Sequence, residues 1–123
     1  MTAGQIDVAI LDGLGLQRQT FDSGERIFLQ DDPATHMYVV CKGRVQVITF
    51  GTVLENVGPG GMFGEMAMID DGPRSAAAMA ADTTEVIAID QAMFQHLVKS
   101  HPDFSLAVMR VLAKRIRRMN ENV

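Results

Sequence analysis

Between residues 17 and 89, apolar and polar residues alternate over short runs, with the period of a strand that has one buried face. Residues 44–49, Arg-Val-Gln-Val-Ile-Thr, show this alternation clearly. Turn-forming Gly, Pro and Asp separate the runs at a spacing of about 8–12 residues. The pattern predicts strands over residues 17–21, 25–29, 36–41, 44–49, 52–57, 76–80 and 84–89.

The two ends of the chain carry apolar residues at helical spacing instead. Residues 6–16 predict a short N-terminal helix that breaks at Gly13 or Gly15. Towards the C-terminus, Asp90 is predicted to cap one helix and Asp103 to cap the last one.

A series of short strands followed by helices favours a mainly β fold with flanking helices. We expect an antiparallel β jelly-roll barrel with one short helix in a loop and helices at the C-terminus. With 123 residues, the chain has the size of one domain. We expect a single domain over residues 1–123, divided into a helical N-terminal segment (1–17), a β-barrel with a binding stretch at 63–77 (18–90) and C-terminal helices (91–123).

Composition indicates the cellular setting. No apolar run approaches the ~20 residues needed to cross a bilayer, so no membrane span is expected. Residues 1–13 lack the basic start of a signal peptide. The single cysteine, Cys41, suits a reducing compartment. These features predict a cytoplasmic location.

Charge is distributed unevenly along the chain. Residues 1–109 carry six Lys and Arg against 14 Asp and Glu, a balance of −8, whereas residues 110–123 have a balance of +4. The acidic body would repel a polyanion such as DNA. The chain also has one Tyr and no Trp, so it offers few rings on which single-stranded nucleic acid could stack.

The candidate chemistry is concentrated in residues 63–77, Phe-Gly-Glu-Met-Ala-Met-Ile-Asp-Asp-Gly-Pro-Arg-Ser-Ala-Ala. A short helix that begins at Gly64 would aim free backbone N–H groups at an anion. Arg74 adds a planar cation suited to phosphate, and Glu65 would suit hydroxyl groups on the same ligand. The stretch therefore predicts a sugar-phosphate site. The alternative is that both side chains are solvated, or form a surface ion pair contributing ~0–1 kcal/mol.

Four motifs extend this interpretation: Phe21-x-x-Gly24-Glu25-x-Ile27, Met37-Tyr38-Val39-Val40-x-x-Gly43-x-Val45-x-Val47, Gly60-x-x-Phe63-Gly64-Glu65-Met66-Ala67 and Pro73-Arg74-Ser75-Ala76. In order and spacing they resemble the cyclic nucleotide-binding domain, the sensor module of catabolite activator protein, kinase regulatory subunits and nucleotide-gated channels. The last two motifs resemble the phosphate-binding cassette of that family, and their residue order is specific to it. Asp31 stands at a loop position where the family usually has glycine, which we interpret as tolerance in a surface loop.

The resemblance implies roles for the residues of the cassette. Glu65 would accept a hydrogen bond from the ribose 2′-hydroxyl, and Arg74 would pair with the cyclic phosphate. Ser75 would offer its hydroxyl and Ala76 its backbone N–H. The remaining implied ligand contacts are Gly64, Met66 and Ala67 at the start of the cassette helix, and Val47 and Leu54 as walls of the base pocket.

The resemblance also implies that the last helix closes over the bound base as a lid. Arg115 would reach back to Glu65, and Met119 and Asn120 are candidate contacts to the base. The alternative is that the basic residues of this helix form a solvated face. The apolar stripe of the helix would equally allow a homodimer.

No helix-turn-helix follows the last helix before Val123, so direct DNA binding is not expected from this chain. The output would then pass to an unknown effector protein, or the chain is the truncated sensor of a channel or transcription regulator.

The function implied is that of a regulatory sensor rather than an enzyme, with no cofactor and with a 3′,5′-cyclic nucleotide as ligand. We favour cAMP, although Ser75 keeps cGMP open because a hydroxyl after the arginine favours guanine in some family members. Two weaker alternatives are a cupin-like metalloenzyme and a non-binding adaptor. His36, His96 and His101 do not form a ligand set, so no metal site is expected.

Overall fold

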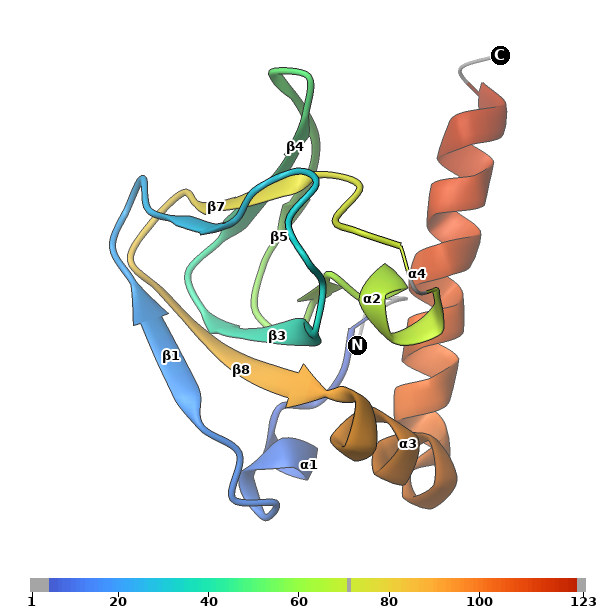
Figure 1. Cartoon of the computed structure of the whole chain (residues 1–123). Coiled ribbons are helices and arrows are strands. Elements are labelled where there is room, and N and C mark those ends of the chain that lie inside the picture. The colour runs from blue at the N-terminus through green and yellow to red at the C-terminus, as the bar shows by residue number, and fades with distance from the viewer. Residues whose placement is uncertain (1–4, 71, 122–123) are drawn as a thin grey trace.

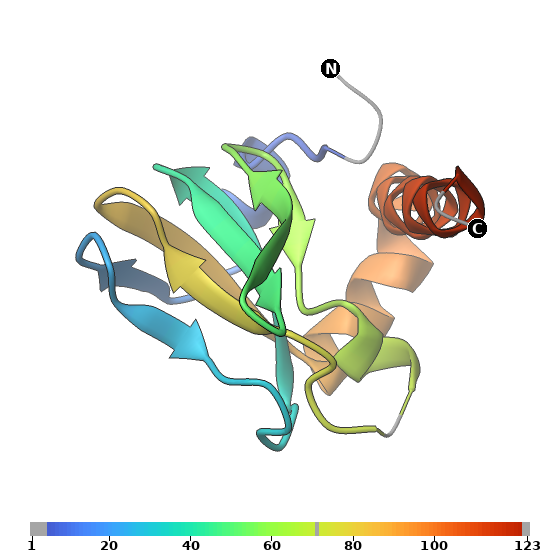
Figure 2. The same cartoon turned by 90° about the horizontal axis from the view of Figure 1, so that it is seen from above.

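The computed structural model describes residues 5–70 and 72–121, including the backbone but not the side chain of Met119. Within these residues, eight strands form two antiparallel sheets (Figures 1 and 2). One sheet contains, in spatial order, β1 (Arg18–Phe21), β8 (Thr84–Asp90), β3 (His36–Lys42) and β6 (Met62–Phe63). The other contains β2 (Arg26–Phe28), β7 (Ala77–Ala80), β4 (Val45–Thr49) and β5 (Thr52–Val57).

The predicted mainly β jelly-roll fold is confirmed, as two packed sheets rather than one closed ring. Each strand expected from the alternation pattern is present, with both ends within one residue of the prediction. The strand that the sequence does not predict is β6, which pairs with β3 through Met62 and Phe63. Two residues after a glycine-rich run are too few to show an alternating pattern.

The side chains of β3 divide the hydrophobic core into two parts. Met37 and Val39 face a cluster that includes the C-terminal helices, whereas Val40 faces a second cluster with Phe63 and Ala78. All five are fully buried. Because successive side chains of a strand point to opposite faces, β3 contributes to both clusters and lies between them.

The helices differ from the predictions at their starts. The N-terminal helix, α1 (Ala9–Asp12), is a single turn rather than most of residues 6–16. Asp90 caps α3 (Gln91–Ser100) as predicted, because its Oδ1 accepts a hydrogen bond from the Met93 amide at 2.8 Å.

The predicted Asp103 cap is wrong. The last helix, α4, spans Pro102–Glu121 and therefore begins one residue before Asp103, which lies in the first turn. Proline suits the first helical position because its missing N–H would have no partner there. The His101 carbonyl accepts the first hydrogen bond, from the Phe104 amide at 2.9 Å. Among the described residues, no helix is long and apolar enough to cross a membrane.

Asp31 adopts the left-handed conformation, with a φ of 71°. The non-glycine residues that tolerate this conformation best are Asn and Asp. The Asp31 amide donates to the Arg74 carbonyl at 2.8 Å, and the Arg74 amide donates to the Asp32 carbonyl at 2.9 Å. This loop is therefore more than a tolerant surface segment, since it holds the backbone of Arg74.

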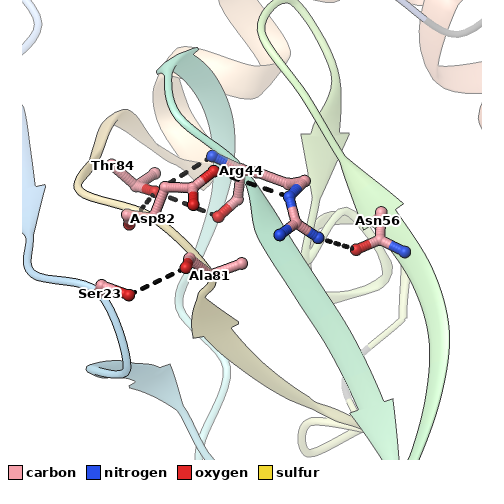
Figure 3. A network of polar contacts seen from close by, with 6 residues as sticks. All are labelled: Ser23, Arg44, Asn56, Ala81, Asp82 and Thr84. Carbon is pink, nitrogen blue, oxygen red and sulfur yellow. Dashed lines mark hydrogen bonds and ion pairs between the residues drawn. The ribbon is translucent and has the colours of Figure 1, made fainter.

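A polar network joins the turn before β4 to the turn before β8, at one end of the two sheets (Figure 3). Thr84 is buried, and its hydroxyl accepts a hydrogen bond from the Arg44 amide at 3.2 Å. The Arg44 side chain donates to Asn56 on β5 at 2.7 Å and lies 3.7 Å from the Asp82 carboxylate. The network fixes the β4–β5 hairpin, which forms one wall of the cavity described below.

Candidate ligand-binding site

A cavity of about 580 Å³ lies between the cassette, the β4–β5 hairpin and α4. Its volume is within the ~300–1,000 Å³ typical of small-molecule sites. Every direct ligand contact that the sequence implies lines this one cavity: Val47, Leu54, Gly64, Glu65, Met66, Ala67, Arg74, Ser75 and Ala76. The fold therefore gathers residues from β4, β5 and the cassette, although their contacts with a ligand stay predictions.

The cassette is shaped by Gly64 and α2 (Met66–Ile69). Gly64 has a φ of 74°, and a Cβ added there would lie 2.8 Å from Nη1 of Arg74. Only glycine adopts this conformation without strain and lets the arginine come so close. The amides of Glu65 and Met66 have no hydrogen-bond acceptor among the described residues. These two amides are available to an anion beside Arg74.

Arg74 is a buried cation without a counter-charge among the described residues. Its side chain donates to the Gly64 carbonyl at 3.1 Å and to the His36 carbonyl at 2.6 Å, and its guanidinium lies 3.9 Å from the centre of the Phe28 ring. Only 6% of the residue is exposed, and its Nε has no partner. No described carboxylate lies within 4.0 Å.

Burial lowers the pKa of the Arg74 guanidinium, because the charged form loses its hydration. Buried charges in proteins are normally paired. An anionic group bound in the cavity would supply the missing partner and would favour the charged form. The arrangement is therefore suited to bind an anion, with the cation held by neutral carbonyls and an aromatic ring.

Glu65 is also fully buried and lines the same cavity. Its Oε1 forms an ion pair with Nη1 of Arg115, whereas its Oε2 has no hydrogen-bond partner among the described residues. An unpartnered buried carboxylate oxygen is costly, and it can only accept a hydrogen bond. A ligand hydroxyl would satisfy it.

Arg115 connects α4 to both sides of the cavity. Besides its ion pair with Glu65, it donates from Nη2 and Nε to Oε2 of Glu55 on β5, at 3.0 and 3.3 Å. Arg118 donates to the Leu54 carbonyl at 3.0 Å. The helix therefore lies against the cavity, beside the sheets (Figure 1). Arg118 itself is exposed, as the alternative of a solvated basic face requires, and its hydrogen bond to Leu54 lies at the surface.

The other two candidate lid contacts, Met119 and Asn120, stay predictions. Asn120 is exposed and does not line the cavity. The side chain of Met119 lies outside the described residues. The α4 residues that do line the cavity with Arg115 and Arg118 are Leu112 and Ile116.

Sequence reasoning missed Glu55, Arg118 and the apolar wall from α4. The only signal for Glu55 was an acid at an inward position of a strand, directly opposite Val47. The contacts of α4 depend on where the helix lies, which its own sequence does not reveal. Elsewhere in the described part of the chain, no three His, Cys, Asp or Glu side chains are grouped so as to hold a metal ion.

Comparison with known proteins finds a family model and relatives that are named for cyclic nucleotide binding or for cAMP. Residues 18–101 match the family model described as the cyclic nucleotide-binding domain. The chain is 29% identical over 113 residues to the CRP-like cAMP-activated global transcriptional regulator of Mycobacterium tuberculosis, covering 88% of this chain and 50% of that protein. It is 33% identical over 106 residues to the cyclic AMP receptor protein of Thermus thermophilus, covering 82% of this chain and 49% of that protein.

The fold comparison agrees with the sequence comparison. The crystal structure of the Thermus thermophilus catabolite activator protein superposes with a TM-score of 0.79 at 31% identity, over 93% of this chain and 56% of that one. The chain thus spans about half the length of the curated relatives that it matches first. By its matched residues, its two-sheet fold and its assembled cassette, this chain belongs to the cyclic nucleotide-binding domain family, whose members are regulatory and generally non-catalytic.

Proposed function

We propose that this chain binds cAMP in the cavity between the cassette and α4, and that α4 reports the bound state. One observation carries the proposal: a buried guanidinium and a buried carboxylate oxygen line the same cavity, and among the described residues the first has no anion and the second no donor. A 3′,5′-cyclic nucleotide brings both missing groups, since its phosphate carries one negative charge and its ribose a free 2′-hydroxyl. Arg74 then binds the phosphate and Glu65 accepts from the 2′-hydroxyl.

The other cassette residues complete the proposed site. Ser75 offers its hydroxyl to the phosphate, and the backbone N–H of Ala76 lies next to it in sequence. Val47 and Leu54 provide an apolar surface for the base on the facing strands. No cofactor is required, since the residues recognise the ligand through hydrogen bonds, charge and apolar contact.

The choice of cAMP rests on two relatives that are named for it, a cAMP-activated regulator and a cyclic AMP receptor protein. Ser75 keeps cGMP as the alternative ligand. Isothermal titration of the folded chain with cAMP, cGMP and 5′-AMP separates these ligands. We expect heat with cAMP, weaker binding of cGMP and none of the linear nucleotide. Absence of heat with both cyclic nucleotides would overturn the proposal.

The proposed role of α4 follows because both Arg115 and the ribose of the ligand would contact Glu65. The ion pair with Arg115 links the helix to the carboxylate that the ribose would also contact. A ligand that bridges the cassette and α4 binds the closed arrangement more tightly than an open one, and it shifts the population by that difference in affinity. The helix would therefore act as lid and output element together.

A second copy of the chain is the partner that α4 favours. Leu106, Met109 and Ile116 are 40%, 57% and 59% exposed. With Ala113 and Asn120 they are spaced alternately three and four residues apart, as along a coiled-coil seam. We expect the wild-type chain to sediment as a dimer and the Met109→Glu variant as a monomer. Met109 lies outside the cavity, so the substitution leaves the proposed ligand contacts in place. A wild-type monomer at high concentration would exclude this partner.

The proposed setting is regulatory and cytoplasmic. Cys41 is free and partly buried, which suits a reducing compartment. Because the relatives are about twice as long, the output is proposed to lie in an effector, either a separate protein or a further part of a longer chain, as in a transcription regulator or a gated channel.

A further inference from the structure

Glu55 is an acidic residue on the inward side of β5, opposite Val47 on β4. Its side chain is 23% exposed and lines the cavity. Its contacts with cations all go to one oxygen, Oε2, which lies 3.0 Å from Arg115 and 4.0 Å from Arg118. The other oxygen, Oε1, has no hydrogen bond or ion pair within the described part of the chain. One acceptor in the cavity wall is therefore unused.

The position of Glu55 relative to the proposed ligand follows from Arg115. One guanidinium contacts both Glu65 and Glu55, so the two carboxylates are separated by about the width of that group. Glu65 is the proposed ribose contact. Glu55 lies next to Leu54 and opposite Val47, the two proposed walls of the base pocket, which puts it on the base side of the proposed ligand. Among the described residues that line the cavity, these two are the only carboxylates.

We propose that Glu55 is a specificity-determining residue whose free carboxylate oxygen accepts a hydrogen bond from the 6-amino group of adenine. The inference rests on the proposed function and deepens it. A carboxylate can only accept, so it favours the donor that adenine presents at its 6-amino group. Guanine places a carbonyl oxygen at that position, which a carboxylate repels.

The test compares cAMP with purine riboside 3′,5′-cyclic monophosphate, which lacks the 6-amino group and keeps the same sugar and phosphate. A hydrogen bond to a charged group changes affinity by roughly tenfold or more. We expect the wild-type chain to bind cAMP at least about tenfold more tightly than the purine analogue. In Glu55→Leu this ratio falls close to one. The control Glu121→Leu, which removes an exposed acid at the end of α4, keeps the wild-type ratio.

The ratio separates direct reading of the base from an indirect effect through Arg115. If Glu55 only positions Arg115, Glu55→Leu weakens both nucleotides equally and leaves the ratio unchanged, which overturns the proposal. Equal affinities in the wild type overturn it as well and require no variant. Should Glu55→Leu not fold, Glu55→Ala replaces it, since it also removes the acceptor, and an unchanged ratio there has the same meaning. Failure of both nucleotides to bind refutes the proposed function itself.

Discussion

Arg115 of α4 and Glu65 of the cassette form an ion pair across the cavity, although they lie far apart in sequence. Glu65 is fully buried, whereas the Arg115 side chain is 27% exposed and also contacts Glu55. The pair couples the C-terminal helix to the cassette. No described residue donates to the other oxygen of Glu65, Oε2, which is therefore available to a ligand.

Replacing Arg74 by Ala is expected to weaken cAMP binding by roughly tenfold to a hundredfold, since it removes charged hydrogen bonds to the phosphate. Arg74→Lys keeps the charge but loses the planar fork, so its affinity for cAMP should fall between those of the wild type and Arg74→Ala. Titration calorimetry of all three proteins measures the effect. A dissociation constant that does not change in Arg74→Ala would show that the phosphate binds elsewhere.

Glu65 is expected to discriminate against ligands without a 2′-hydroxyl. The wild-type chain should bind 2′-deoxy-cAMP about tenfold or more weakly than cAMP, because a buried acceptor would lose its donor. In Glu65→Gln the difference between the two ligands should shrink, since the acceptor loses its charge. Glu121→Gln serves as the control for loss of an exposed acid. If Glu65→Gln retains the full discrimination, the ribose does not contact this residue.

Gly64→Ala is expected to impair both stability and binding. The residue has a φ of 74°, and its new Cβ would lie 2.8 Å from Nη1 of Arg74. A strained left-handed residue costs about 1–3 kcal/mol of unfolding free energy, and displacement of Arg74 should lower cAMP affinity. Urea denaturation and calorimetry measure the two effects. Gly13→Ala is the matched control, since its φ is −78° and no atom lies within 4 Å of the added Cβ.

Arg115→Met should release α4 from the cavity. The loss leaves the buried charge of Glu65 unpaired, at a cost expected to be below the ~3–5 kcal/mol found for fully buried pairs, because Arg115 is partly solvated. Hydrogen exchange of the amides in the second half of α4 should accelerate by roughly tenfold for each ~1.4 kcal/mol lost. Equal protection in wild type and variant would mean that other contacts hold the helix.

The strands and the cassette could be predicted from sequence because their signals are local. The alternation in residues 44–49 and the turn at Gly43 predict a hairpin, and Gly64, Glu65 and Arg74 share one loop with a recognisable order. The cap at Asp90 is equally local. Each of these features depends on residues that lie within a few positions of one another or follow a specific motif.

The features that sequence reasoning missed depend on contacts between distant segments. Glu55 could be assigned to the cavity wall only from the structure, in which α4 places Arg115 beside it. The role of Asp31 follows from its hydrogen bond to the Arg74 carbonyl, which no pattern in residues 28–33 indicates. The strand β6 exists because β3 offers a free edge, and the first residue of α4 is set by Pro102 rather than by the more familiar cap at Asp103.

A crystal structure of the chain grown with cAMP tests the central claim most directly. The account predicts that the nucleotide occupies the cavity beneath α4, with its phosphate against the Arg74 guanidinium and its 2′-hydroxyl donating to Glu65. A nucleotide bound with neither contact, or bound outside this cavity, would contradict the account.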